Sequence, residues 1–206
     1  MSKNEITIRR TQKEEFDSVA KLMAQAYYND VFFKWCVPDD GVREQIIYNY
    51  YKVYLTSQQC FTCVAVDKNN HLFGAMVWLS NETESWIYEK IEQAVGKYAP
   101  QFAEVAEKSH ANEPKGTSFW QLVGFGTSNE ARGLGIGIKL MDFALTEFDT
   151  MNIPTYLEAS TAYVEGKGVY GKFGYRFFSD LMYFDDGKVM LYPLWRDVGT
   201  NDEIKN

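Results

Sequence analysis

The sequence predicts a mixed α/β fold, in which helices flank a central sheet within one domain. Three observations predict this class. Stretches of alternating apolar residues, typical of strands, are interspersed with stretches whose apolar residues recur every three or four positions, as in helices. Their order is β-α-α-β-β-α-β-α-β-α-β-β, which favours a sheet covered by helices. The length of 206 residues, 46% of them hydrophobic, suits one domain with a sizeable core.

The first helix is marked by its start and by its apolar face. Thr11 and Glu14 form a capping box, T-x-x-E, directly after a strand at 6–10. The residues that share one helical face behind this box are Phe16, Val19, Ala20, Met23 and Tyr27. Residues 29–40 break the pattern and are expected to form an aromatic loop. The elements that follow are a helix at 42–56 and a hairpin of strands at 60–67 and 71–79.

The second half of the chain is expected to alternate between helices and strands. Residues 82–110 have helical periodicity, but Pro100 should kink or break the segment. The later elements are strands at 118–127, 155–160, 175–185 and 188–195, and helices at 135–151 and near 166–173. We assign residues 1–198 to one domain with a helical insertion at about 82–112, followed by a polar tail at 199–206.

The composition argues against several classes of protein. The net charge is −7, whereas a surface that binds nucleic acid usually shows a basic excess, so no nucleic-acid partner is expected. No run of eighteen apolar residues occurs, so no membrane partner is expected either. Residues 1–16 are too highly charged for a secretory signal, which favours a cytoplasmic protein.

The sequence does not predict a metal site. Cys60 and Cys63 have the C-x-x-C spacing, but they lie on an expected strand, where residues three apart point to opposite faces. His71 and His110 lie far apart in the sequence, and we interpret both as surface residues.

A glycine-rich stretch, R-G-L-G-I-G at 132–137, joins the strand at 118–127 to the helix that follows it. The first turn of a helix presents unpaired backbone N–H groups at the positive end of the helix dipole. Glycines let an anion approach this backbone without meeting a side chain, and Arg132 adds a positive charge. The stretch therefore predicts a phosphate-binding loop. The alternative is a tight strand-to-helix turn without a ligand.

Two common phosphate-binding motifs do not fit this stretch. The dinucleotide fingerprint G-x-G-x-x-G begins with Gly124 and Gly126, but Asn129 stands where its third glycine should be. The nucleotide loop G-x-x-x-x-G-K-[ST] fails at Lys139, which is followed by Leu140. The phosphate ligand must therefore be of another kind.

The stretch resembles the R/Q-x-x-G-x-G/A signature of the GCN5-related N-acetyltransferases (GNATs), a family that uses acetyl-coenzyme A (acetyl-CoA). Downstream, L-E-A-S at 157–160 and V-Y-G-K-F-G-Y-R-F-F at 169–178 are similar to the end of the family's domain. The element order fits from residue 6 to about 195, and the helical insertion resembles a subgroup with a longer lid on the substrate side. The resemblance implies the GNAT fold and transfer of an acetyl group to a primary amine of a small molecule or peptide.

The resemblance also implies which residues bind coenzyme A. Residues 132–137, with the amides through Ile138, would hold its pyrophosphate. The strand end around Phe125 and Thr127 would be splayed from its neighbour and pair with the pantetheine arm, and an N–H near Phe125 would point at the thioester carbonyl. The coenzyme-binding candidates are Phe125, Thr127, Arg132, Gly133, Leu134, Gly135, Ile136, Gly137, Ile138 and Tyr170.

Two residues are candidates for proton transfer. Tyr170 falls where the family often has a tyrosine near the coenzyme sulfur, and its hydroxyl would protonate the departing thiolate as general acid. The interval after Ser160 is longer than in comparable members, so Tyr163 is a second candidate, and a plain core role for Tyr170 is the alternative. Glu158 is the candidate general base; a carboxylate on a solvated strand face is an equal alternative.

Two other functions stay open from the sequence alone. One is a coenzyme A-binding or sensory module without turnover, and the other is a transferase of longer acyl groups. The glycine-rich loop together with the tyrosine motif favours the enzyme. We expect acetyl-CoA as co-substrate, no metal, and a small-molecule or peptide amine as the partner, and we allow for a homodimer.

Overall fold

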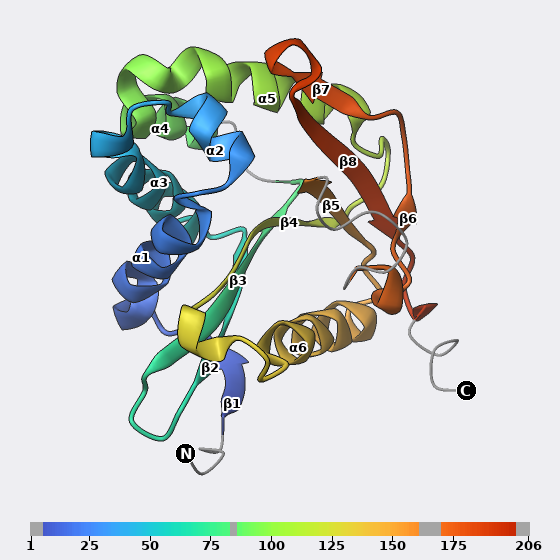
Figure 1. The fold of residues 1–206 in the computed structure, drawn as a ribbon. Coiled ribbons are helices and arrows are strands. Elements are labelled where there is room, and N and C mark those ends of the chain that lie inside the picture. Colours follow the sequence, from blue (N-terminus) through green and yellow to red (C-terminus); the bar gives the residue numbers. More distant parts are fainter. Residues whose placement is uncertain (1–5, 83–85, 161–169, 201–206) are drawn as a thin grey trace.

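The computed structural model describes residues 6–82, 86–160 and 170–200, and these residues form a sheet with helices on both faces (Figure 1). The strands are β1 (Thr7–Arg10), β2 (Cys60–Val66), β3 (Leu72–Ser80), β4 (Trp120–Thr127), β5 (Thr155–Ser160), β6 (Arg176–Phe177), β7 (Met182–Phe184) and β8 (Val189–Arg196). Their order in the eight-stranded sheet is β1-β2-β3-β4-β5-β8-β6, and β7 also pairs with β8. Within this described sheet, β4 and β5 run parallel and every other pair is antiparallel. The expected mixed sheet is confirmed.

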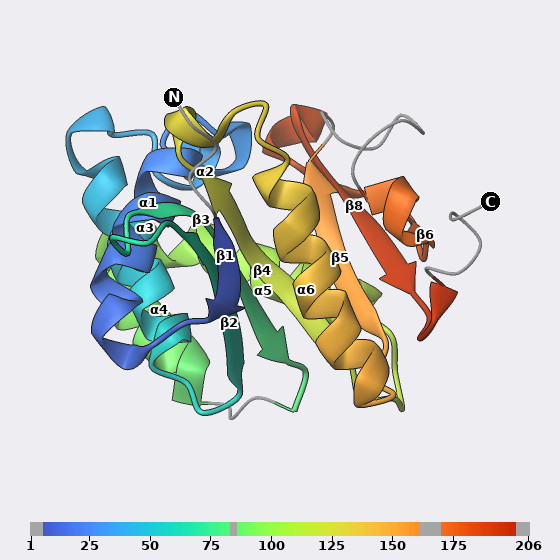
Figure 2. The same cartoon turned by 90° about the horizontal axis from the view of Figure 1, so that it is seen from below.

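The helices lie in two layers. They are α1 (Phe16–Tyr27), α2 (Val31–Cys36), α3 (Asp40–Leu55), α4 (Trp86–Val95), α5 (Ala99–Asn112) and α6 (Ile136–Thr150). Helices α1 and α3 pack on one face of the sheet and α6 packs on the other, as the two views in Figures 1 and 2 show. Among the described residues, no helix has the length and the apolar character that crossing a membrane requires.

Apolar residues fill the space on both sides of the sheet, which explains why β2 reads C-F-T-C-V-A-V without strict alternation. Cys63 belongs to the core under α6, whereas Cys60 packs against the core under α1 and α3. The prediction that these two thiols diverge is therefore confirmed. In the part of the chain that the structure describes, no three His, Cys, Asp or Glu side chains are grouped so as to hold a metal ion.

Two predictions near the N-terminus are corrected. Residues 31–36 form α2 and not a loop, because the Asp30 carboxylate accepts hydrogen bonds from the N–H groups of Phe32 (2.9 Å) and Phe33 (3.3 Å) and so caps a helix. The first capping contact lies one residue later than predicted, with the N–H of Gln12 donating to Glu15 Oε2 at 2.8 Å. Glu15 is also held by Arg9 of β1, which fixes this register.

The insertion and the closing strands refine the sequence prediction further. The predicted break near Pro100 is confirmed: the chain turns at Gly96, where φ is +58°, and Pro100 lies in the first turn of α5. The strand expected at 175–185 is split into β6 and β7. The interruption faces Pro193 of β8, which has no N–H to donate to the ladder.

Candidate active site

A fork between β4 and β5 is the centre of the candidate site. The two strands pair in parallel over three positions, from Trp120 with Thr155 to Leu122 with Leu157. Beyond them, the described residues of the two strands, 123–127 and 158–160, no longer pair with each other. The predicted splaying of this strand end is therefore present. A cavity of about 780 Å³ lies along the fork and is lined by residues of both strands and of the helices α1 to α5.

A bulge in β4 re-aims its backbone at the fork. In the ladder with β3, Val77 pairs with Gly124 and Trp78 pairs with Leu122, so Val123 has no opposite residue. The N–H of Phe125 turns to the α1 side, where it donates to the Tyr27 hydroxyl at 2.9 Å. This is the N–H that the sequence predicts to face the thioester carbonyl.

A second tyrosine completes this contact with β4. The Tyr51 hydroxyl donates to the carbonyl of Val123 at 3.1 Å, and its ring stacks on that of Tyr27 at 5.7 Å between centroids. Gly124 permits this approach, because a Cβ at that position would lie 2.6 Å from the Tyr51 ring. The carbonyl of the bulged residue Val123 and the N–H of Phe125 are thus both bonded to hydroxyls of tyrosines that line the cavity.

The glycine-rich loop follows β4 and opens α6. Gly133 and Gly135 have φ values of +77° and +70°, a backbone conformation that favours glycine. A Cβ built at either position would meet nothing within 4 Å. The carbonyl of Gly135 accepts from the N–H of Lys139 at 3.2 Å, and no side chain among the described residues caps the helix. The N–H groups of the first helical turn therefore stay available for an anion.

The side chains of the loop have different surroundings. Arg132 lines the cavity, and no carboxylate of the described residues pairs with it. Leu134 and Ile138 are exposed, whereas Ile136 is buried in the core under α6, so these three would contribute backbone groups. Packing explains why residue 137 is a glycine, because a Cβ there would lie 2.6 Å from the Phe125 ring.

Glu158 lies at the branch of the fork, directly after the last residue of β5 that pairs with β4. Its carboxylate lines the cavity and accepts hydrogen bonds from Ser109 Oγ at 2.8 Å and from the Tyr156 hydroxyl at 3.1 Å. Burial raises the pKa of Glu158 to about 7; the two hydrogen bonds lower it in part, and the charge of Glu113 raises it further. The side chain is half-buried and faces the cavity, so it does not lie on a fully solvated strand face, and its role as a base stays a prediction.

Tyr170 is buried, lines the same cavity and begins a short 3₁₀ helix, Tyr170–Phe173. Its ring lies edge-on to that of Tyr175 at 5.9 Å between centroids. The second candidate acid, Tyr163, lies outside the described residues.

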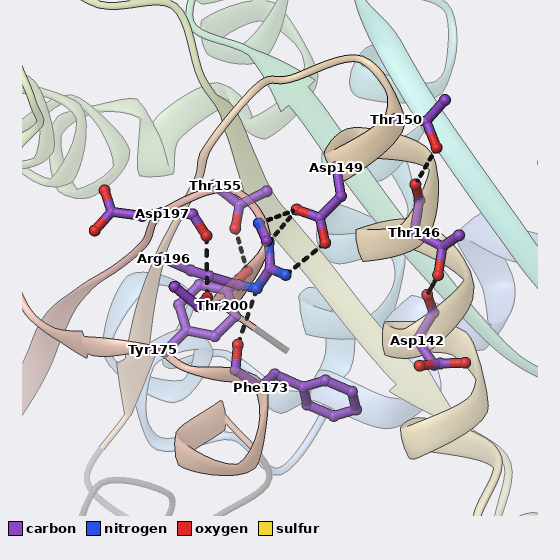
Figure 3. Close-up of polar contacts among 11 residues, drawn as sticks. Asp142, Thr146, Asp149, Thr150, Thr155, Phe173, Tyr175, Arg196, Asp197 and Thr200 are labelled. Carbon is purple, nitrogen blue, oxygen red and sulfur yellow. Dashed lines mark hydrogen bonds and ion pairs between the residues drawn. The ribbon is translucent and has the colours of Figure 1, made fainter. Parts of the chain in front are cut away.

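A buried arginine holds the segment that carries Tyr170 (Figure 3). Arg196, at the end of β8, donates from Nε to the carbonyl of Phe173 at 2.9 Å and forms two bonds, of 2.8 and 2.6 Å, with the carboxylate of Asp149 on α6. The Tyr175 hydroxyl lies 2.7 Å from Thr155 Oγ1 of β5. The short helix is therefore tied to β5, β8 and α6, which fixes the entry of Tyr170 into the cavity.

The chain is similar to known proteins in its structure and not in its sequence. No family model matches the sequence, and no curated protein sequence matches it. Solved structures do match. An acetyltransferase described as histone acetyltransferase HPA2 and related, from Corynebacterium glutamicum, is 19% identical over 94% of this chain and 97% of its own, with a TM-score of 0.68. Arylalkylamine N-acetyltransferase 2 from Aedes aegypti is 9% identical over 95% and 100%, with a TM-score of 0.69. The NatC complex bound to a Gag peptide and CoA is 14% identical over 94% and 98%, with a TM-score of 0.55.

The chain has the GNAT fold. In this GNAT fold the sequence motifs mark the glycine-rich loop and the strand that carries Glu158, whereas several residues that bond to β4 or to Glu158 escape them. These residues are Tyr27, Tyr51, Ser109 and Tyr156. Tyr27 was visible only as a core-facing position of the first helix. Nothing in the sequence links Ser109 to Glu158, which lies 49 residues further along the chain.

Proposed function

We propose that this protein is an N-acetyltransferase that moves an acetyl group from acetyl-CoA to a primary amine. One observation carries the proposal: a single cavity reaches from Arg132, the first residue of the glycine-rich loop, to the half-buried carboxylate of Glu158 at the fork of β4 and β5. An anion site and a base at the two ends of one cavity suit a reaction between a phosphate-bearing donor and an amine.

The described residues fit a coenzyme A molecule. The N–H groups at the start of α6 and the Arg132 guanidinium would hold the pyrophosphate, with open space at Gly133 and Gly135. The unpaired edge of β4 at 123–127, including Phe125 and Thr127, would bond to the amide groups of the pantetheine arm. The likeness to a CoA-bound GNAT structure supports the same donor.

Glu158 supplies the base that the amine requires. A lysine-like amine has a pKa of about 10.4 and arrives protonated, so it must lose a proton before it attacks. A carboxylate with a pKa of about 7 can take this proton at neutral pH more effectively than an ordinary glutamate. The amine nitrogen then forms a bond to the acetyl carbon while the carbon–sulfur bond breaks.

Phe125 and Tyr170 would stabilise the charge that moves to oxygen and then to sulfur. The N–H of Phe125 would donate to the thioester oxygen, in place of its present bond to the Tyr27 hydroxyl. The Tyr170 hydroxyl would give its proton to the departing thiolate. The second proton that the amine nitrogen loses restores the Tyr170 hydroxyl, and the proton held by Glu158 passes to solvent. The products are therefore an amide, coenzyme A as a free thiol and one proton.

Thiol release with a panel of amines tests this function. Purified protein is mixed with acetyl-CoA and each amine, and free thiol is followed over time, while calorimetry measures coenzyme A binding. We expect thiol release that depends on both the amine and the protein. Binding of coenzyme A without thiol release for any amine would favour the non-catalytic binding module. Faster thiol release with longer acyl-coenzyme A donors would show that the protein transfers longer acyl groups.

A further inference from the structure

The half of the cavity beyond the fork is walled by aromatic and aliphatic side chains. Its apolar lining residues include Phe32, Phe33, Tyr50, Tyr54, Ile91 and Phe102. Three of these rings form a cluster, with Phe102 lying 5.1 Å from Tyr50 and 6.3 Å from Phe33 between centroids. The hydroxyls of Tyr50 and Tyr54 lie 2.8 Å apart and satisfy each other. This wall therefore offers an occupant apolar surface.

The charges along the cavity are divided between its two ends. Arg132, beside the glycine-rich loop, is the only lysine or arginine among the described lining residues. The carboxylates that line the cavity are those of Asp30, Glu92, Glu113 and Glu158. An acceptor with a negative charge would meet these carboxylates with no lysine or arginine of the described lining beside them.

Glu158 differs from Asp30 and Glu113 in its partners, and it differs from Glu92 because Glu92 is exposed. Asp30 caps α2, and Glu113 contacts both His110 at 2.8 Å and Lys115 at 3.5 Å. Glu158, in contrast, is bonded to two neutral hydroxyls, and no cation of the described residues pairs with it. A buried carboxylate without a cationic partner is unfavourable, and an ammonium group would supply that partner.

The ring cluster lies within electrostatic reach of this carboxylate. Burial raises the pKa of Tyr50 well above its usual range, and the charge of Glu158 adds to the rise. Burial raises the pKa of Tyr54 as well, and Glu158 again contributes. Glu158 and these rings line the same cavity, so an amine whose nitrogen contacts Glu158 can place its body against the rings.

We propose that the acceptor is a primary monoamine whose body is apolar, of about the size of one aromatic ring, and free of negative charge. This inference rests on the proposed transferase function, because it takes the far half of the cavity as the acceptor site. The ammonium would contact Glu158, and the body would lie against Phe33, Tyr50 and Phe102. A free amino acid would bring a second carboxylate close to Glu158. A polyamine would bring a second ammonium against the ring cluster, and two of the other lining carboxylates, Asp30 and Glu113, are already bonded within the protein.

Four small amines separate these features. 2-Phenylethylamine carries one ammonium and a ring. Phenylalanine adds only a carboxylate, ethylamine removes only the ring, and spermidine replaces the ring by further ammonium groups. Calorimetric titration into the protein, with and without coenzyme A, should give an affinity for 2-phenylethylamine at least tenfold above each of the others. Tighter binding of phenylalanine or spermidine, or no binding of 2-phenylethylamine at millimolar concentration, would overturn the inference.

A pair of variants locates the ring. Phe102→Leu should weaken 2-phenylethylamine several-fold and leave ethylamine unchanged, because only the former contacts the cluster. Phe143→Leu on α6, on the opposite face of the sheet, is the matched control and should change neither affinity. Equal effects of the two variants would remove the cluster from the acceptor site. Amine binding is measured without turnover, so a failure of thiol release or of coenzyme A binding counts against the proposed function alone.

Discussion

The two ends of the cavity are built in different ways. The coenzyme end consists mainly of backbone groups from consecutive residues, 132–138, with one guanidinium beside them. The acceptor end consists of side chains from α2, α3, α4, α5 and β5, which lie far apart in the sequence. A local sequence motif can therefore predict the coenzyme end, whereas the acceptor end is formed only when distant parts of the chain pack together.

The two ends also act through different physical terms. In the proposed function the loop would bind the coenzyme through its shape and its unpaired N–H groups near the surface, so substitutions there should change the affinity for the coenzyme. The acceptor end works by burial, which raises the pKa of Glu158 to about 7 and also raises the pKa of Tyr156. Substitutions there should change turnover and its dependence on pH.

The largest effect is expected for the carboxylate at the fork. Glu158→Gln keeps the volume but cannot take a proton. Its amide oxygen can accept from one of the two hydroxyls, Ser109 or Tyr156, and its NH2 group can donate to the other. Turnover should fall by about 10³-fold, within the usual range for a general base. The control Glu107→Gln removes an equal charge at an exposed position of α5. Thiol release at the wild-type rate in Glu158→Gln would exclude Glu158 as the base.

A smaller loss is expected for the hydroxyl near the sulfur. Tyr170→Phe should lower turnover by about 10²-fold and change coenzyme A affinity only slightly, because the hydroxyl acts late in the reaction. Tyr183→Phe is the matched control: it removes a tyrosine hydroxyl at an exposed position of β7. Steady-state rates across pH, with coenzyme titrations, make the comparison. If Tyr170→Phe is as active as wild type, Tyr163 becomes the residue to test.

The sequence predicts the coenzyme end of the cavity better than it predicts the acceptor end. The succession of strands and helices along the chain, the start of α6 and the position of Arg132 follow from local periodicity and from the glycines of the loop. The contact between Ser109 and Glu158 does not, because it joins an insertion helix to a strand through tertiary packing. The extra helix α2 was missed because its signal is a single cap, Asp30, before six residues rich in aromatics.

At the coenzyme end, a side chain should interfere directly with the anion. Gly135→Val introduces a branched side chain at the N-terminus of α6, and coenzyme A affinity should fall at least tenfold, or roughly 1.4 kcal/mol. Gly135 has a positive φ, so valine also strains the backbone. Gly116→Val is the matched control, because Gly116 has a φ of +72° and open space but lies outside the loop. Calorimetry of both variants, after melting curves confirm folding, separates the two effects. Equal affinity in Gly135→Val and wild type would show that the loop does not hold the coenzyme.

The smallest effect is expected for a substitution in the insertion helix α5. It tests how the rate depends on pH through the protonation of Glu158. Ser109 donates to the charged form of Glu158, which lowers the pKa of that carboxyl against the effect of burial. Ser109→Ala should therefore raise the pKa further. A base is active when it is deprotonated, so the wild-type rate should rise with pH through about 7, and the rise should move to higher pH in the variant. At pH 7 the variant should be a few-fold slower, whereas at pH 9 the two rates should converge.

A general disturbance of α5 would slow the reaction at every pH, so convergence at high pH identifies the electrostatic effect. Ser109→Thr keeps a hydroxyl at the same position and should restore the wild-type profile. Affinity for coenzyme A should not change in either variant, since the loop at 132–138 lies at the other end of the cavity. A rate profile that is flat between pH 6 and 8 in the wild type would argue against Glu158 as the base. A profile that rises but does not move in Ser109→Ala would keep Glu158 as the base and show that the insertion closes the cavity without adjusting its chemistry.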